Sequence, residues 1–138
     1  MTILDTNVVS ALMNDPPEQR VITWLDREIA SSIWTTSITV LEIRTGLQAM
    51  PAGKKQSKLS EVFERFLDGI EHRVAVFDEE SARRAADLTL SRRKIGRLVE
   101  LRDTMIAGIV LARHGSLATR NIVHFSDISA TVINPWTA

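Results

Sequence analysis

The sequence predicts an α/β fold in which a central parallel sheet of about five short strands is flanked by helices on both faces. Short β-branched and aliphatic runs alternate with longer segments in which apolar residues recur every three or four positions. The length of 138 residues suits about one domain, so we expect a single domain over residues 1–138. No apolar run approaches the roughly 20 residues that span a bilayer.

The first half of the chain contains two predicted strands, at residues 2–4 and 33–36. Helical periodicity predicts four helices, at residues 8–13, from Pro16 or Pro17 to residue 29, from a cap at Ser37 or Thr39 to between Gly46 and Gly53, and at residues 54–70. The last of these carries its apolar residues on one side, which predicts that this side packs against the core.

The second half adds three predicted strands, at residues 74–77, 117–119 and 131–133. Asp78 is expected to cap a helix that runs through Leu88, and another helix is expected over residues 101–114. The stretch from Ser91 to Glu100 is basic and contains Gly96, so we expect a mobile loop there.

Composition limits the possible functions. There is no cysteine, which excludes disulfides, thiolate catalysis and the usual structural zinc sites. The 17 basic and 17 acidic residues cancel, so a nucleic-acid role would require a local basic patch. The N-terminus lacks the basic-then-apolar layout of a secretion signal, so we expect a soluble cytoplasmic protein.

Three acidic residues occupy positions where predicted strands end or helices begin. Asp5 follows the first strand, Glu42 lies in the helix after the second, and Asp103 lies in the first turn of the helix that starts at residue 101. Because the carboxyl ends of parallel strands share one edge of the sheet, we expect these acids to converge there. At separations of ~5 Å and an effective dielectric of ~20, each pair would repel by about 3 kcal/mol.

Repulsion of that size has to be relieved. The trio would cost on the order of 10 kcal/mol, against a total stability of ~5–15 kcal/mol for a small domain. Protons or a cation must therefore occupy the site. Oxygen ligands without cysteine favour Mg²⁺ or Mn²⁺ over zinc.

Each acid also has a purely structural interpretation. Asp5 suits a helix cap, Asp103 suits a first-turn helix stabiliser, and Glu42 suits a surface ion pair with Arg44 or Lys58. The residues taken one at a time leave both interpretations open.

Four segments, taken in chain order, resemble the PIN domain of VapC-like and FitB-like toxins. They are ILDTNVVS at 3–10, TSITVLEIRTG at 36–46, RDTMIA at 102–107, and LATRN at 117–121 running on to VINPW at 132–136. The resemblance implies strand order 3-2-1-4-5 and a Mg²⁺-dependent endoribonuclease toxin, with Mn²⁺ able to substitute. It further implies an RNA substrate, a homodimer, a VapB-like or FitA-like antitoxin as inhibitor, and operator DNA contacted only through that antitoxin.

The resemblance also assigns roles to residues. Asp5, Glu42 and Asp103 match the catalytic, metal-binding acids of the family. Thr6 and Asn7 match the polar pair that orients the first acid.

Further along the chain, Thr119 matches a supporting hydroxyl. The family often has a fourth acid at the positions that are Asn121 and His124 here. Asp127 is the candidate substitute, Asn121 could supply an amide oxygen instead, and His124 is expected to be an ordinary surface histidine.

The densest basic stretch leads directly to Asp103 and comprises Arg83, Arg84, Arg92, Arg93, Lys94, Arg97 and Arg102. RNA contacts are expected at Arg92, Arg93, Arg97 and Arg102, with a solvated helix face as the alternative. Antitoxin contacts are expected at Arg44 and on the helices at 17–30 and 54–70. The tryptophans at positions 24, 34 and 136 are expected in the core or an interface.

Other classes of protein fit less well. A phospho-acceptor receiver needs an acid pair after the first strand and a lysine after the last, and the chain has neither. An Asp-x-Asp phosphatase would need an aspartate where Asn7 stands. A catalytically silent PIN-like module that only binds its antitoxin remains open, because the fourth acid is missing.

Overall fold

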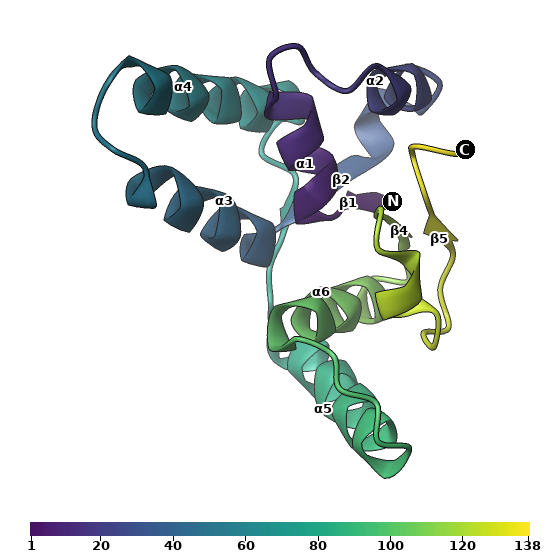
Figure 1. Cartoon of the computed structure of the whole chain (residues 1–138). Helices are drawn as coiled ribbons and strands as arrows, with labels where there is room; N and C mark the ends of the chain where they lie inside the picture. Colours follow the sequence, from purple (N-terminus) through teal and green to yellow (C-terminus); the bar gives the residue numbers. More distant parts are fainter.

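The computed structural model describes residues 1–138, and its five strands form one parallel sheet in the order β3-β2-β1-β4-β5 (Figure 1). The strands are β1 (Thr2–Leu4), β2 (Ile33–Thr36), β3 (Val74–Ala75), β4 (Ser116–Ala118) and β5 (Val132–Ile133). The predicted fold class and strand order are confirmed.

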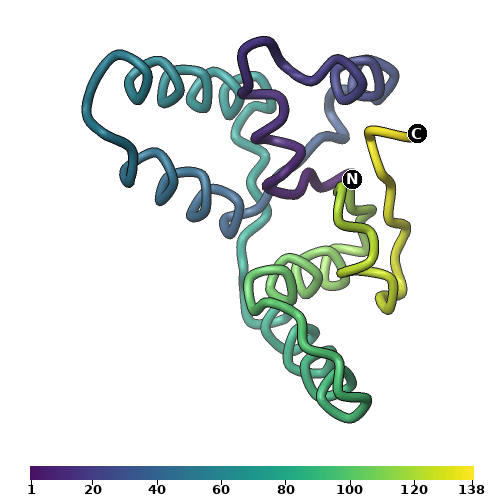
Figure 2. The backbone as a smooth tube through the Cα atoms, in the orientation of Figure 1, coloured from purple at the N-terminus to yellow at the C-terminus, as the bar shows by residue number.

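Six α-helices connect or follow these strands. They are α1 (Thr6–Met13), α2 (Gln19–Asp26), α3 (Ser37–Ala49), α4 (Lys54–Gly69), α5 (Glu79–Lys94) and α6 (Leu101–Ala112). Short 3₁₀ turns occur at Ala30–Ser32 and Ile122–Phe125. Figure 2 shows α3 with α4, and α5 with α6, as two helical hairpins at opposite ends of the view.

Two hydrophobic clusters cover the two faces of the sheet. Successive residues of β1 point to opposite faces, so Leu4 joins the cluster with α1 to α4 and Ile3 joins the cluster with α6. Trp24 is buried in the first cluster, and Trp136 and Trp34 pack against the first and second clusters respectively. Trp24 is therefore a core residue as expected, whereas Trp34 and Trp136 are only partly buried at the margins of the two clusters.

The α5–α6 hairpin depends on a close approach of the two helices at Gly108. A Cβ at this position would lie 2.4 Å from the carbonyl oxygen of Ser81 and 2.9 Å from the Cβ of Ala85. Only glycine therefore fits here. Asp78 caps α5 as predicted, because its Oδ1 accepts hydrogen bonds from the Ser81 N–H at 2.9 Å and the Ser81 hydroxyl at 2.7 Å.

Several predicted helix ends are wrong by a few residues. Helix α1 starts at Thr6 because Asp5 is its N-cap. Helix α2 starts only at Gln19 rather than at the prolines, because Glu18 is its N-cap and has extended geometry. Helix α6 stops before His114, which has a positive φ of 52°.

Three further boundaries differ in the middle of the chain. The N-cap of α3 is Thr36, whose hydroxyl accepts from the N–H of Thr39. Strand β3 ends at Ala75, and the N–H of Phe77 turns to the Ser37 hydroxyl instead of a neighbouring strand. No helix is both long enough and apolar enough to cross a membrane.

The expected mobile loop at Ser91–Glu100 is wrong in its first part. Helix α5 continues through Lys94, and Arg92 is buried with 3% of its surface exposed. The turn comes later, at Gly96 with a φ of 69°. Basic residues in the last turn of a helix interact favourably with its carbonyl end, which is consistent with α5 extending through them.

Candidate active site at the carboxyl edge of the sheet

Asp5 lies at the carboxyl end of β1, the central strand of the sheet. Its N–H donates to the carbonyl of Ala118 at 2.9 Å, which continues the pairing of β1 with β4. The fully buried Ile3 and Leu4 hold the strand in the interior, and Asp5 itself is only 3% exposed. The structure therefore places this acid where the sequence predicted it.

Four hydrogen bonds fix the Asp5 carboxylate and its support. The Thr119 hydroxyl donates to Oδ2 at 2.7 Å, and the side-chain amide of Asn7 donates to the same oxygen at 3.2 Å. The Thr6 N–H donates to Oδ1 at 2.8 Å. The Thr119 hydroxyl in turn accepts from the backbone N–H of Asn121 at 3.0 Å, so Asn121 supports the site through its main chain.

A hydrogen bond from Thr6, the first residue of α1, connects Glu42 to the region around Asp5. The Thr6 hydroxyl donates to Glu42 Oε1 at 2.8 Å, while Oε2 lies 3.8 Å from the Arg102 guanidinium. Arg44 instead pairs with Glu64 on α4. The surface pair of Glu42 with Arg44 or Lys58, one of the structural interpretations, is therefore wrong.

Asp103 occupies the first turn of α6 as predicted. Its Oδ2 lies 2.8 Å from Nδ1 of His124, which belongs to the 3₁₀ turn Ile122–Phe125. His124 is exposed, but the expectation of an ordinary surface histidine missed this contact with a candidate catalytic acid.

The three acids are close enough to affect one another's charge. Burial raises the pKa of Asp5 to about 6, although the hydrogen bonds from Thr119 and Thr6 oppose the change. The negative charges of Asp103 and Glu42 contribute to the same rise. No cation forms an ion pair with Asp5, so the edge of the sheet carries negative charge that a bound cation would neutralise.

The donor chemistry fits a hard divalent cation. The side chains nearest Asp5 offer carboxylate, hydroxyl and amide oxygens, and there is no thiolate in the chain. No group of three or more carboxylate or imidazole side chains is arranged to hold a metal ion. Glu42 is bonded to Thr6 and Asp103 to His124, so one ion shared by all three acids would require side-chain rotations.

Asp127, the candidate substitute for the fourth acid, is engaged by arginine. Arg92 donates to both carboxylate oxygens of Asp127, at 2.9 Å each, and this guanidinium holds the pKa of Asp127 below its usual value. Arg92 also donates to the Thr104 hydroxyl and the His124 carbonyl, each at 2.8 Å. The buried guanidinium thus ties α5 to α6 and to the segment that carries His124.

The predicted RNA-binding arginines are mostly engaged within the protein. Arg92 is buried, so its assignment as an RNA contact is wrong. Arg97 pairs with Asp127, and Arg102 pairs with Glu100. Of the four predicted residues, Arg93 alone has no ion pair.

The sequence interpretation missed Arg120, which follows the Thr119 hydroxyl directly. Its backbone N–H donates to Oδ1 of Asn7 at 3.1 Å, and its guanidinium lies 4.9 Å from the ring centroid of Trp136. The sequence did offer one clue to Arg120: it directly follows Thr119, which matches a supporting hydroxyl of the family.

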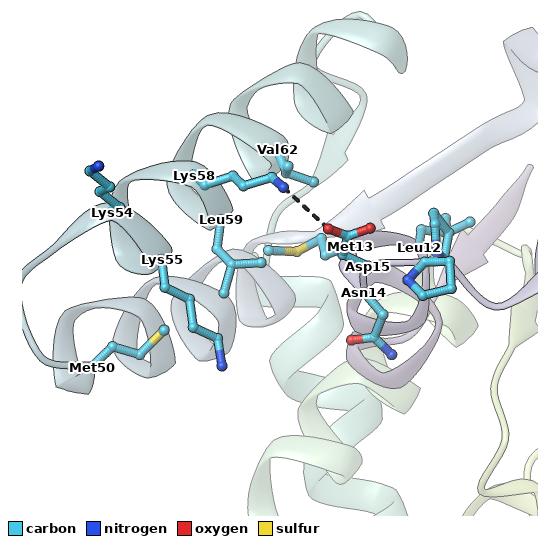
Figure 3. Close-up of a pocket in the computed structure, with 12 residues that line it drawn as sticks. Leu12, Met13, Asn14, Asp15, Met50, Lys54, Lys55, Lys58, Leu59 and Val62 are labelled. Atoms are coloured by element: carbon cyan, nitrogen blue, oxygen red, sulfur yellow. Dashed lines mark hydrogen bonds and ion pairs between the residues drawn. The ribbon is translucent and has the colours of Figure 1, made fainter.

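A second surface feature is a groove between the ends of α1, α3 and α4, with a volume of about 1050 Å³ (Figure 3). Its apolar lining comes from Leu12, Met13, Met50, Leu59 and Val62, and Lys54, Lys55 and Lys58 stand along it. Lys58 forms an ion pair with Asp15 at 3.2 Å, whereas the ammonium groups of Lys54 and Lys55 have no ion-pair partner. For convenience we call this the lysine groove.

Comparison with known proteins identifies the family. The profile of the PIN domain matches residues 2–130. The chain is 37% identical to the plasmid stability protein StbB of Pseudomonas syringae pv. tomato, over 100% of both chains. It is 35% identical to the VapC ribonuclease Y4jK of Sinorhizobium fredii, over 99% of this chain and 98% of the relative.

Solved structures give the same result. The complex FitAcB from Neisseria gonorrhoeae contains a chain that superposes with a TM-score of 0.91 at 32% identity, covering 100% of both chains. FitAB bound to an IR36 DNA fragment contains a chain with a TM-score of 0.89 at 32% identity, covering 99% of this chain and 96% of that one.

Proposed function

The chain belongs to the PIN-domain family, among the VapC-like and FitB-like toxins of type II toxin–antitoxin systems, and we propose that it is a metal-dependent endoribonuclease. It hydrolyses RNA phosphodiester bonds in the cytoplasm with Mg²⁺, for which Mn²⁺ can substitute. The observation that carries this proposal is Asp5, a buried carboxylate at the sheet edge whose pKa is raised by its burial and by two further acids. A ribonuclease among the full-length relatives supports it.

The proposed mechanism assigns each side chain a task. Asp5, Asp103 and Glu42 are the metal-binding residues. A divalent ion bound there would act as a Lewis acid toward a phosphate oxygen and the attacking water. Thr119 and Asn7 hold Asp5 in place through their hydrogen bonds.

Glu42 has the geometry of a proton acceptor near this centre. Its Oε1 is held by the Thr6 hydroxyl, and its side chain is about one-fifth exposed, which leaves it accessible to a reacting water. We propose that Glu42 accepts the proton that the attacking water loses. Arg102 lies 3.8 Å from the other oxygen, Oε2, so the two carboxylate oxygens of Glu42 face different partners.

The decisive test is RNA cleavage by purified protein freed of any co-purified partner. Structured RNAs are incubated with Mg²⁺, Mn²⁺ or chelator, and products are resolved by size. We expect cleavage with either ion and none with chelator or with Asp5→Asn. Asp87→Asn, an exposed acid on α5, is the matched control and should cleave normally.

Two outcomes would contradict the mechanism or the activity. Unchanged cleavage by Asp5→Asn in Mg²⁺ would rule out the metal mechanism. A wild-type protein that cleaves no RNA would favour the alternative of a silent PIN-like module that acts through antitoxin binding. The missing fourth acid, with His124 near its usual place and Asp127 held by Arg92, is the observation behind that alternative.

We further propose that a VapB-like or FitA-like antitoxin inhibits the enzyme and seats an apolar, acidic segment in the lysine groove. The apolar floor suits such a segment, and the unpaired Lys54 and Lys55 suit its acids. Arg44 is not expected to be the main contact, because it pairs with Glu64 and lies 5.5 Å from the Phe63 ring centroid. We propose that operator DNA is contacted through the antitoxin, and the solved structure of FitAB bound to an IR36 DNA fragment is consistent with a DNA-bound complex.

Charge reversal tests the groove. The double substitution Lys54→Glu with Lys55→Glu should weaken binding of the antitoxin encoded beside this gene at least tenfold, measured by titration calorimetry. Arg65→Glu, also on α4 and without an ion pair, is the control. If both variants bind the antitoxin with equal affinity, the antitoxin binds outside the lysine groove.

We also propose a homodimer. Large apolar side chains are exposed around the connection between α5 and α6, with Ile95 at 73%, Leu98 at 94% and Leu101 at 68%. Exposed apolar residues gathered on one surface indicate an interaction site. Leu98→Asp should convert a dimer to a monomer in sedimentation velocity, and an unchanged dimer would rule out this surface.

A further inference from the structure

A second cavity, of about 320 Å³, lies beside the acid site on the other side of α1 from the lysine groove. Its lining comes from α1 and its end and from two segments further along the chain: Asn7, Ser10, Ala11, Asn14, Glu18, Arg120 and Trp136. Asn7 is shared with the acid site, because its amide donates to Asp5 at 3.2 Å while its Oδ1 accepts from Arg120 at 3.1 Å. We call this the Arg120 cavity. Asn7 alone separates it from Asp5 in the proposed catalytic site.

Arg120 is the cation near the acid site that is free to bind a ligand. Its guanidinium forms no ion pair and donates no hydrogen bond, whereas Arg92 and Arg102 are committed to Asp127 and Glu100. Two contacts nevertheless hold it in place, namely the Trp136 ring at 4.9 Å and the backbone bond to Asn7. A guanidinium that is fixed but unpaired suits a phosphate oxygen, since little freedom is lost on binding.

The rest of the Arg120 cavity suits a nucleobase better than a second phosphate. Glu18 on its wall would repel a phosphate but accept hydrogen bonds from base N–H groups. The amide of Asn14 can donate or accept. Trp136 and the guanidinium stacked on it add flat surfaces of the kind that bind bases. The volume is at the small end of the range for ligand sites, as one base requires.

We propose that the Arg120 cavity is a nucleotide subsite for single-stranded RNA, in which Arg120 binds the phosphate next to the scissile bond and the cavity holds the adjoining base. The inference rests on the proposed ribonuclease function and adds where the substrate is gripped. It replaces the expectation that the arginines between residues 92 and 102 provide the main RNA contacts, since three of those four are engaged within the protein.

The test measures RNA binding separately from cleavage. Asp5→Asn serves as the parent, because it should bind RNA without cutting it, and a fluorescein-labelled single-stranded RNA is titrated by anisotropy at several salt concentrations. Adding Arg120→Gln should weaken affinity at least fivefold and reduce the slope of log K against log salt by about 0.7, the value of one phosphate contact on a single strand. Adding Arg65→Gln, an exposed arginine on α4 without an ion pair, should change neither quantity.

A second variant tests whether the Arg120 cavity binds a base. Adding Glu18→Gln should leave the salt slope unchanged but alter the relative affinities for RNAs that differ only in the base beside the cleavage site. An Arg120→Gln variant with the affinity and slope of its parent would overturn the subsite while leaving the ribonuclease proposal standing. A parent that binds no RNA would overturn both.

Discussion

Asp5→Asn should make the protein more stable at neutral pH in the absence of metal, although it removes the central residue of the proposed active site. Burial raises the pKa of Asp5 from 3.8 to about 6 in the folded protein. Each tenfold change in proton affinity corresponds to about 1.4 kcal/mol, so holding this carboxylate ionised costs on the order of 3 kcal/mol at pH 7. Asparagine has the shape of the neutral form and avoids that cost.

The pH dependence follows from the raised pKa. Below about pH 4 the carboxyl is neutral in both the folded and unfolded states, so the wild type and variant should be equally stable. Between about pH 4 and pH 6 only the unfolded chain releases the proton, and the wild type loses stability relative to the variant as pH rises. Above pH 6 the difference should stay constant at its full value.

Urea unfolding in chelator at pH 4, 5 and 7 measures this difference, and Asp87→Asn should stay within about 0.5 kcal/mol of the wild type throughout. Mg²⁺ at 100 times its Kd should then stabilise the wild type by about 2.7 kcal/mol and the variant much less. The reasoning is refuted if Asp5→Asn is the less stable protein at pH 7 in chelator, or if the difference does not change with pH.

Two further predictions concern the α5–α6 hairpin. Gly108→Ala should destabilise the protein by about 2 kcal/mol or more in urea unfolding, because the new Cβ would lie 2.4 Å from the Ser81 carbonyl oxygen. A variant as stable as the wild type would show that the two helices can separate at little cost. Arg92→Met should cost about 2–4 kcal/mol, because it removes both hydrogen bonds to Asp127 and leaves that carboxylate only the longer contact with Arg97 at 3.6 Å. Arg93→Met next to it should cost under about 0.5 kcal/mol. Equal effects would mean that the buried ion pair adds no stability.

Local patterns were sufficient to predict the sheet and the position of the first acid. Ile3 and Leu4 followed by Asp5 specify a buried strand with an acid at its end, and the later strands repeat this pattern of short apolar runs between helices. The prediction that Asp78 caps α5 also held, since a cap depends on residues three apart. Such features are set by neighbours in the chain.

Tertiary partners could not be predicted in the same way. Arg92 and Arg93 are adjacent and chemically identical, but only Arg92 faces Asp127, which lies 35 residues further along the chain. The contact of His124 with Asp103 likewise depends on where the 3₁₀ turn packs against α6. Arg120 was overlooked because a single basic residue carries no periodic pattern, and its importance depends on Trp136.

The central place of β1 in the sheet has a consequence for the order in which the protein matures. The neighbours of β1 are β2, about 30 residues later, and β4, more than 110 residues later. The hydroxyl that holds Asp5 also comes from Thr119, so a ribosome must synthesise most of the chain before the pocket can close. Nascent and prematurely terminated chains therefore carry Asp5 without Thr119, and the pocket proposed for the chemistry can form only once translation is nearly finished.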